Sequence, residues 1–157
     1  MATTGNLSSA NLLAQEAALA LPRFELADAL SLGALATELA TDRGLPVVIV
    51  VAHGVREVFR AALPGTTPDN DDWLARKRRV VERFEASTLA LRVTYEERGT
   101  DFPTATGLSE LEYAAHGGGW PIRVQGVGVA GFLGVSGLPQ LEDHAFIVEV
   151  LGRFLAD

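Results

Sequence analysis

The hydrophobic pattern in the first third of the chain predicts two helices. Apolar residues recur at helical spacing in two segments, the first capped by Ser8 or Ser9 and the second by Asp28. A proline stops the first segment and a glycine ends the second, as is typical of helix ends. We therefore expect an N-terminal helix within residues 1–21 and a second helix that ends at Gly44.

Three further segments have the composition of β-strands. Residues 47–52 form a β-branched run without polar alternation, which predicts a strand that helices cover on both faces. Residues 55–63 follow a His-Gly turn and are expected to return antiparallel, with His53 solvated in that turn. The short stretch of residues 23–26 is also expected to be extended.

Residues 71–97 contain neither glycine nor proline and are predicted to form one long helix, capped by Asp69 or Asn70. Lys77 lies within its apolar row. Its aliphatic stem can extend along the edge of the core, or its ammonium can hold an anionic ligand or a carboxylate. The basic run at residues 76–79 is interpreted as a solvated helix face whose charges pair with nearby acidic residues. A loop at residues 99–107 and a short helix at residues 109–115 are expected to follow.

A glycine-rich stretch, residues 116–144, has the strongest constraints in the chain. Residues 121–125 and 127–135 predict a β-hairpin with Gly126 at its turn. One face of the second strand is apolar. The other face is rich in glycine, which indicates that a packed helix, a second subunit or a ligand approaches the backbone closely, and the packed helix is favoured. A C-terminal helix at residues 141–156 completes the chain.

Three catalytic or cofactor motifs in this stretch are disfavoured. The glycines of residues 126–131 spell G-x-G-x-x-G, but a dinucleotide site needs a strand, a helix and a βαβ unit around this motif. A hydrolytic triad of Ser136, His144 and Asp143 is disfavoured. In a triad the carboxylate orients the histidine towards the serine, and the adjacent residues Asp143 and His144 cannot easily adopt this arrangement. A metal site formed by His116, His144 and Asp143 is also disfavoured. Asp143 and His144 are adjacent on a helix, so their side chains diverge by about 100° and cannot easily bind one ion. The interpretations of Asp143 as dipole compensation and of His144 as a partly buried histidine remain open.

Composition narrows the classes of function. The chain has 157 residues, 48% hydrophobic and 21% charged, which predicts a single domain spanning residues 1–157. Its net charge of −7 repels nucleic acid and anionic membrane, so neither is an expected partner. There is no cysteine, which excludes disulfides and thiolate sites and fits a reducing cytoplasm. The first apolar run lacks the features of a signal peptide or membrane span, so a cytoplasmic location is expected.

Several motifs, taken in order, resemble the haem-degrading-domain family of HbpS-like and GlcG-like proteins, in the uncharacterised cytosolic branch that includes a yeast protein. The resemblance covers nearly the whole chain. It implies an α+β, profilin-like three-layer α/β/α sandwich with a five-stranded antiparallel sheet, and a symmetric homo-oligomer. The motifs that carry it are Asp69-Asn70, Trp73, Arg76-Lys77, Phe84, Ser87, His116-Gly117-Gly118, Pro121-Ile122, Gly126, Gly128, residues 135–138 and Asp143-His144.

Two functional hypotheses follow. In the first, haem or another small ligand binds between the glycine-rich strand and the start of the long helix, with His116 or His144 as iron ligand or proton donor. In the second, the same residues belong to a non-catalytic, homo-oligomeric interaction module. Neither hypothesis assigns a catalytic residue or a metal site. The predicted ligand-binding residues are Asn70, Trp73, Lys77, His116, Gly117, Gly118, Ser136, Asp143 and His144.

Overall fold

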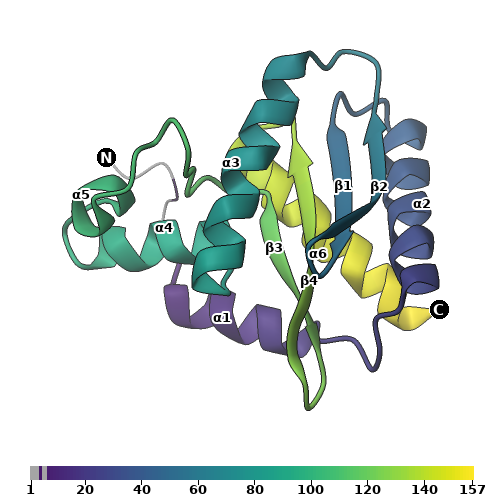
Figure 1. Cartoon of the computed structure of the whole chain (residues 1–157), viewed down its shortest axis with the longest axis horizontal. Helices are drawn as coiled ribbons and strands as arrows, with labels where there is room; N and C mark the ends of the chain where they lie inside the picture. The colour runs from purple at the N-terminus through teal and green to yellow at the C-terminus, as the bar shows by residue number, and fades with distance from the viewer. Residues whose placement is uncertain (1–3, 5–6) are drawn as a thin grey trace.

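The computed structural model describes residue 4 and residues 7–157, and it has α+β architecture (Figure 1). Among these residues no helix has the length and apolar character needed to cross a membrane. The elements in chain order are α1 (Ser9–Ala18), α2 (Leu26–Asp42), β1 (Val48–His53), β2 (Arg56–Ala62), α3 (Pro68–Phe84), α4 (Thr88–Glu97), α5 (Phe102–Thr106), β3 (Gly119–Val124), β4 (Gly128–Ser136) and α6 (Gln140–Ala156).

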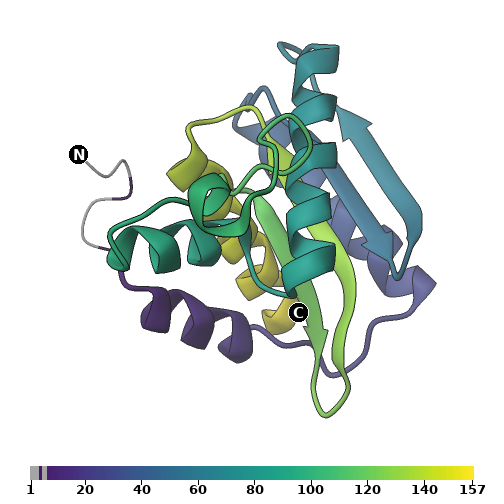
Figure 2. The same cartoon turned by 60° about the vertical axis from the view of Figure 1, so that its left-hand side comes forward.

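The strands form an antiparallel sheet in the order β2-β1-β4-β3. Both predicted hairpins are confirmed, and the β3–β4 turn projects beyond the helices (Figure 2). The predicted central strand is confirmed as β1, whose residues from Val48 to Ala52 are all buried. His53 ends this strand rather than standing free in a turn. Its Nε2 lies 3.0 Å from the carbonyl oxygen of Phe24.

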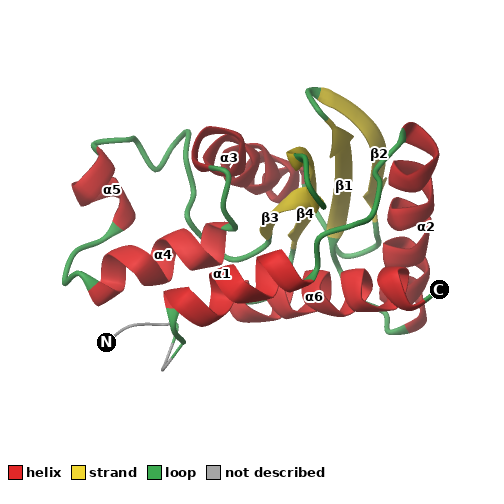
Figure 3. Ribbon diagram, turned by 90° about the horizontal axis from the view of Figure 1, so that it is seen from below, coloured by secondary structure: helices red, strands yellow, loops and turns green. Residues whose placement is uncertain are grey.

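Helices cover the sheet on both faces, as a buried β-branched strand requires. Alternate residues of β1 and β4 pack on α2 and α6, and the others pack on α3, including Phe132 against Leu74 and Val81. In Figure 3, α3 and α6 lie on opposite sides of the sheet. A Cβ on Gly134 would lie 2.7 Å from Leu74 of α3. The glycine-rich face of β4 therefore accommodates a packed helix, as favoured from the sequence.

The prediction of a five-stranded sheet is wrong, because the described residues form four strands. No strand forms at residues 23–26. Leu21 instead makes an isolated parallel bridge to Val124, at the β3 edge of the sheet. Since α2 begins at Leu26 and Glu25 serves as its N-cap, only residues 22–24 remain between the bridge and the cap, fewer than the roughly five or six residues of a typical strand.

The prediction of one long helix at residues 71–97 is also wrong. The chain breaks between α3 and α4 at Glu85, which has a left-handed φ of 53°, and Ser87 then caps α4 through the N–H of Ala90. The carboxylate of Glu16, which is 1% exposed, accepts a hydrogen bond from the Ser87 N–H at 3.0 Å and pairs with Arg123 at 3.2 Å. A contact with α1, distant in the sequence, therefore stabilises the corner.

The helix starts and the later segments differ from the prediction in detail. Thr67, rather than Asp69 or Asn70, is the N-cap of α3, and Asn70 completes its capping box. The predicted loop at 99–107 contains α5, and residues 109–115 form turns and irregular chain instead of a helix. The predicted terminal helices correspond to α1 and α6. The part of the first prediction that covers residues 1–3 and 5–6 lies outside the described residues.

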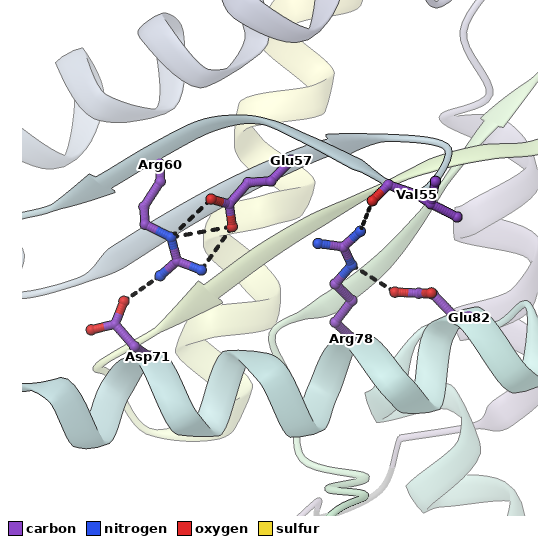
Figure 4. Close-up of polar contacts among 6 residues, drawn as sticks. All are labelled: Val55, Glu57, Arg60, Asp71, Arg78 and Glu82. Atoms are coloured by element: carbon purple, nitrogen blue, oxygen red, sulfur yellow. Dashed lines mark hydrogen bonds and ion pairs between the residues drawn. The ribbon is translucent and has the colours of Figure 1, made fainter.

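Within the basic run on α3, Arg76 and Arg78 pair with nearby acidic residues as predicted, but Lys77 is buried instead of solvated. Arg78 pairs with Glu82 one turn along the helix at 2.6 Å and donates to the carbonyl of Val55 at 2.9 Å (Figure 4). Arg60 of β2 bonds both Glu57 and Asp71. These contacts join α3 to the β1–β2 hairpin and fix the position of the helix on its face of the sheet.

Candidate functional site

A buried ion pair joins α3 to the first turn of α6. Lys77 Nζ lies 3.2 Å from Asp143 Oδ2 and donates to the carbonyl oxygen of Val135 at 3.1 Å. Lys77 is 3% exposed and Asp143 is 2% exposed. Of the two interpretations of Lys77, the structure therefore shows a cation that holds a carboxylate.

The electrostatics of this pair are dominated by the loss of water. Burial lowers the pKa of Lys77, and the nearby Asp143 carboxylate opposes this change. Burial raises the pKa of Asp143 to about 6, against the opposing effects of Lys77 and of the Leu138 N–H, which donates to Oδ1 at 3.0 Å. The Asp143 carboxyl is consequently mostly ionised at neutral pH and becomes protonated in mildly acidic solution.

Gly117 and Gly118 allow the backbone to approach this pair. Gly118 has a φ of 120°, and a Cβ there would lie 2.3 Å from the carbonyl oxygen of Val135 and 2.6 Å from Lys77 Nζ. A Cβ on Gly117 would lie 2.2 Å from the carbonyl oxygen of Gln140. Real side chains cannot occupy such positions. Gly118 therefore allows the backbone to approach the ion pair, and Gly117 allows it to approach the first turn of α6.

A pocket of about 220 Å³, termed here the Lys77 pocket, opens next to the ion pair. The structure brings six of the nine predicted ligand-binding residues to this pocket, and it places Gly117, Gly118 and His144 elsewhere. Sequence reasoning missed three lining residues at the β4–α6 connection. Gln140 is the most informative of these, because its Oε1 accepts the N–H of Gly117 at 3.1 Å. The lining residues are Asn70, Trp73, Lys77, His116, Ser136, Gly137, Leu138, Gln140 and Asp143.

Gln140 carried a sequence signal that could have identified it. It is the first residue of a helix that follows Pro139, at the end of the glycine-rich stretch. A polar side chain at such a position lies near the unpaired N–H groups of the helix.

His116 lies at the edge of the Lys77 pocket and is half-buried. Its ring meets the ring of Trp73 edge to face, with 5.0 Å between the centroids. Burial, together with the positive charges of Arg92, Lys77 and Arg76, lowers the pKa of His116 to about 4. The imidazole is therefore neutral at pH 7. His116 also borders a second pocket of about 210 Å³ that Arg92 and Tyr113 line.

Trp73 presents a fixed aromatic surface to the same pocket. The guanidinium carbon of Arg76 lies 3.9 Å from the centroid of the indole ring. Arg76 in turn pairs with Asp72 at 3.0 Å and donates to the carbonyl of Glu110 at 3.1 Å. The cation–π contact and these polar bonds hold the indole in one orientation.

His144 points away from Asp143, although the two residues are adjacent. Its Nε2 lies 2.9 Å from Gln15 Oε1, and its ring centroid lies 5.7 Å from that of Trp120. Burial lowers the pKa of His144 to about 4. Within the described part of the chain no group of three or more His, Cys, Asp or Glu residues could hold a metal ion.

Comparison with known proteins gives a consistent result. Residues 24–152 match the family model described as haem degrading protein HbpS-like. The chain is 49% identical to a UPF0303 protein of Streptomyces avermitilis over 142 residues, which cover 90% of this chain and 87% of the relative. It is 46% identical to a UPF0303 protein of Burkholderia cenocepacia over 138 residues, with coverage of 88% and 84%.

Solved structures extend the similarity to the fold. The crystal structure of the Ybr137w protein matches with a TM-score of 0.85 and 28% identity, over 95% of this chain and 88% of that one. The crystal structure of HbpS matches with a TM-score of 0.65 and 22% identity, over 85% and 90%. A PduOC:haem complex matches with a TM-score of 0.68 and 20% identity, over 82% and 93%. At these last two identities the likeness concerns the fold alone.

Proposed function

This chain belongs to the HbpS-like family of haem degrading proteins, and from that premise we propose that it binds a small anionic molecule in the Lys77 pocket. The observation that carries the proposal is the buried Lys77–Asp143 pair beside a concave site with a fixed indole. Paired buried charges cost desolvation energy, so a pair at the edge of a pocket is a candidate for function as well as stability.

The local charge favours an anionic ligand, although the protein is acidic overall. Three cations, Arg92, Lys77 and Arg76, act on His116 strongly enough to lower its pKa. A carboxylate that enters the Lys77 pocket would be attracted by these cations and repelled by Asp143, which also lines the pocket. Asn70 and Gln140 add amide groups that can hydrogen-bond to it.

Haem carries anionic propionates, so it meets the charge requirement of the Lys77 pocket, but only in part its requirement for size. His116 is a neutral imidazole at the pocket edge and would hold the iron, while the surrounding cations would face the propionates. When bound, the group would supply the redox chemistry that the polypeptide lacks. The cavity of about 220 Å³ is smaller than the roughly 300–1,000 Å³ of typical ligand pockets. A cavity of this size does not enclose a whole haem group, so the fit is limited to the residues that would contact it.

An absorption titration with haemin tests this proposal. We expect a saturable Soret shift that is lost in His116→Ala and retained in His144→Ala, because His144 does not line the Lys77 pocket. His53→Ala is the matched control, since His53 lies at the other end of the sheet. Far-UV circular dichroism would verify that each variant is folded.

Benzoate separates haem binding from binding of anions in general. A flat haemin titration combined with saturable benzoate-induced NMR shifts at His116 and Trp73 would exclude haem and retain the anion site. The absence of both responses would overturn the proposal.

In that case a homo-oligomeric interaction module would be the better hypothesis. Apolar side chains at two turns favour it, because Leu111 is 83% exposed and Val127 is 77% exposed. Light scattering at several protein concentrations would detect the assembly. A cytoplasmic location remains a prediction from the sequence.

A further inference from the structure

A further pocket, of about 530 Å³, lies between α1, α4, α6 and the residues Thr4 and Leu7 that precede α1, and is termed here the apolar pocket. The first turns of α6 separate it from the Lys77 pocket. Gln140 and Asp143 face the Lys77 pocket, whereas Leu141 and His144 face the apolar pocket, as the period of a helix requires. Leu12 and Leu89 form part of its buried wall.

Gln15 and His144 provide the polar side chains on its α1 and α6 sides. His144 Nε2 lies 2.9 Å from Gln15 Oε1, and the ring is 5% exposed. Because burial keeps the imidazole neutral at pH 7, Nε2–H donates to Gln15 and Nδ1 is left as an acceptor. In the described part of the chain this buried Nδ1 has no hydrogen-bond partner. An unsatisfied buried acceptor is destabilising, so a hydroxyl group that reached Nδ1 and donated to it would gain a hydrogen bond.

We propose that the apolar pocket binds an uncharged, largely apolar molecule with one hydroxyl group, such as an aromatic alcohol, whose hydroxyl hydrogen-bonds to the Gln15–His144 pair. The proposal is independent of the function assigned to the Lys77 pocket.

The charge and shape of the apolar pocket support this class of ligand. Among the described residues that line it none is charged, so nothing compensates the burial of an anion or a cation. Its volume lies within the roughly 300–1,000 Å³ of pockets that enclose small molecules. A mostly apolar wall with few convergent polar groups is the usual composition of such sites.

Binding of 2-naphthol, followed by calorimetry and by NMR of the folded full chain, tests the proposal. 2-Methoxynaphthalene has a similar shape but cannot donate a hydrogen bond. We expect 2-naphthol to bind about tenfold more tightly, as one hydrogen bond contributes about 1.4 kcal/mol. This preference should disappear in His144→Phe, which keeps an aromatic ring and removes both nitrogens.

Ala145 offers a variant that fills the apolar pocket without disturbing the core, because this residue is exposed on α6 and lines the pocket. Ala145→Phe should weaken 2-naphthol binding at least tenfold. Ala105→Phe, at an exposed position of α5, is the matched control and should bind normally. His116→Ala should also bind normally, which separates this site from the Lys77 pocket.

Three outcomes would overturn the inference. The first is the absence of a saturable response to 2-naphthol. The second is equal affinity for the two naphthalene compounds in the native chain. The third is a set of Leu141 and Val148 resonances that move with protein concentration, which would show that the surface is covered by a second copy of the chain.

Discussion

Lys77 and Asp143 are 66 residues apart in the sequence, and their charged groups meet 3.2 Å apart beneath the glycines that precede β3. Both side chains are almost completely buried, so neither charge has water as an alternative partner. The pair fixes the first turn of α6 against α3. It therefore determines the shape of the Lys77 pocket as well as its charge.

Replacing Lys77 by methionine should lower the free energy of unfolding by about 3–5 kcal/mol, because the Asp143 carboxylate would be left buried without its partner. The double variant Lys77→Met/Asp143→Leu should recover most of this loss, since no buried charge remains. Urea unfolding of the three proteins measures both effects. If Lys77→Met were as stable as the native chain, the Asp143 carboxylate could not be buried as described.

Gly118→Ala should destabilise the protein by about 2–4 kcal/mol, since it adds a backbone clash to an unfavourable φ. Gly126→Ala is a matched control. Gly126 also has a positive φ, of 73°, but a Cβ there would meet no atom within 4 Å. We expect that change to cost only about 1 kcal/mol. Equal losses in thermal unfolding would show that the approach of the glycine backbone to Lys77 is not required.

The pH dependence of stability should report on His144. Its pKa is lowered from 6.5 to about 4 in the folded chain, so folding disfavours the protonated form. Its contribution to stability is therefore present above pH 6.5 and is lost as the pH falls towards 4, by roughly 3 kcal/mol in total. Urea unfolding of the native chain and His144→Phe between pH 7 and pH 4 should reveal the difference.

The comparison must be made between the two proteins, because Asp143 acts in the opposite direction. Its pKa is raised to about 6, so its contribution is present below its unfolded value of 3.8 and is lost as the pH rises through 6. This contribution is common to both proteins and cancels in the difference. If the free energies of unfolding of the two proteins changed in parallel with pH, folding would not lower the pKa of His144.

Glu85→Gly should stabilise the chain by about 0.5–1 kcal/mol. Glu85 has a φ of 53° at the end of α3, where glycine avoids the steric cost of the left-handed conformation. The side chain is exposed, and the hydrogen bond from Arg123 is to the backbone carbonyl, which glycine retains. A rise in the midpoint of thermal unfolding would verify this, whereas a fall would mean that the carboxylate itself matters.

Local patterns in the sequence determined much of the fold. The unbroken β-branched run could only be a strand with cover on both faces, and the glycine at residue 126 marked the turn of the second hairpin. Helical periodicity identified α2 and α6. These features depend on neighbours within a few residues, which is why the sequence alone indicates them.

Six residues around the Lys77 pocket were also predicted, because they belong to the motifs through which the chain resembles the HbpS-like family. Gln140 was missed because its role depends on the N–H of Gly117, which is 23 residues away. The assignment of His144 to the same site remains a prediction without support in the geometry. The side chain is directed to α1 through Gln15, which is 129 residues away.

The sequence by itself determined the two hairpins, helices α2 and α6, and the helix layer on each face of the central strand. Only the tertiary structure decided the break between α3 and α4, the number of strands and the opposite directions of Asp143 and His144. The physical reason is that these features depend on distant contacts. Glu16 meets Ser87 across 71 residues, and Lys77 meets Asp143 across 66. Periodicity cannot indicate such contacts, because it reports only which face of an element is apolar.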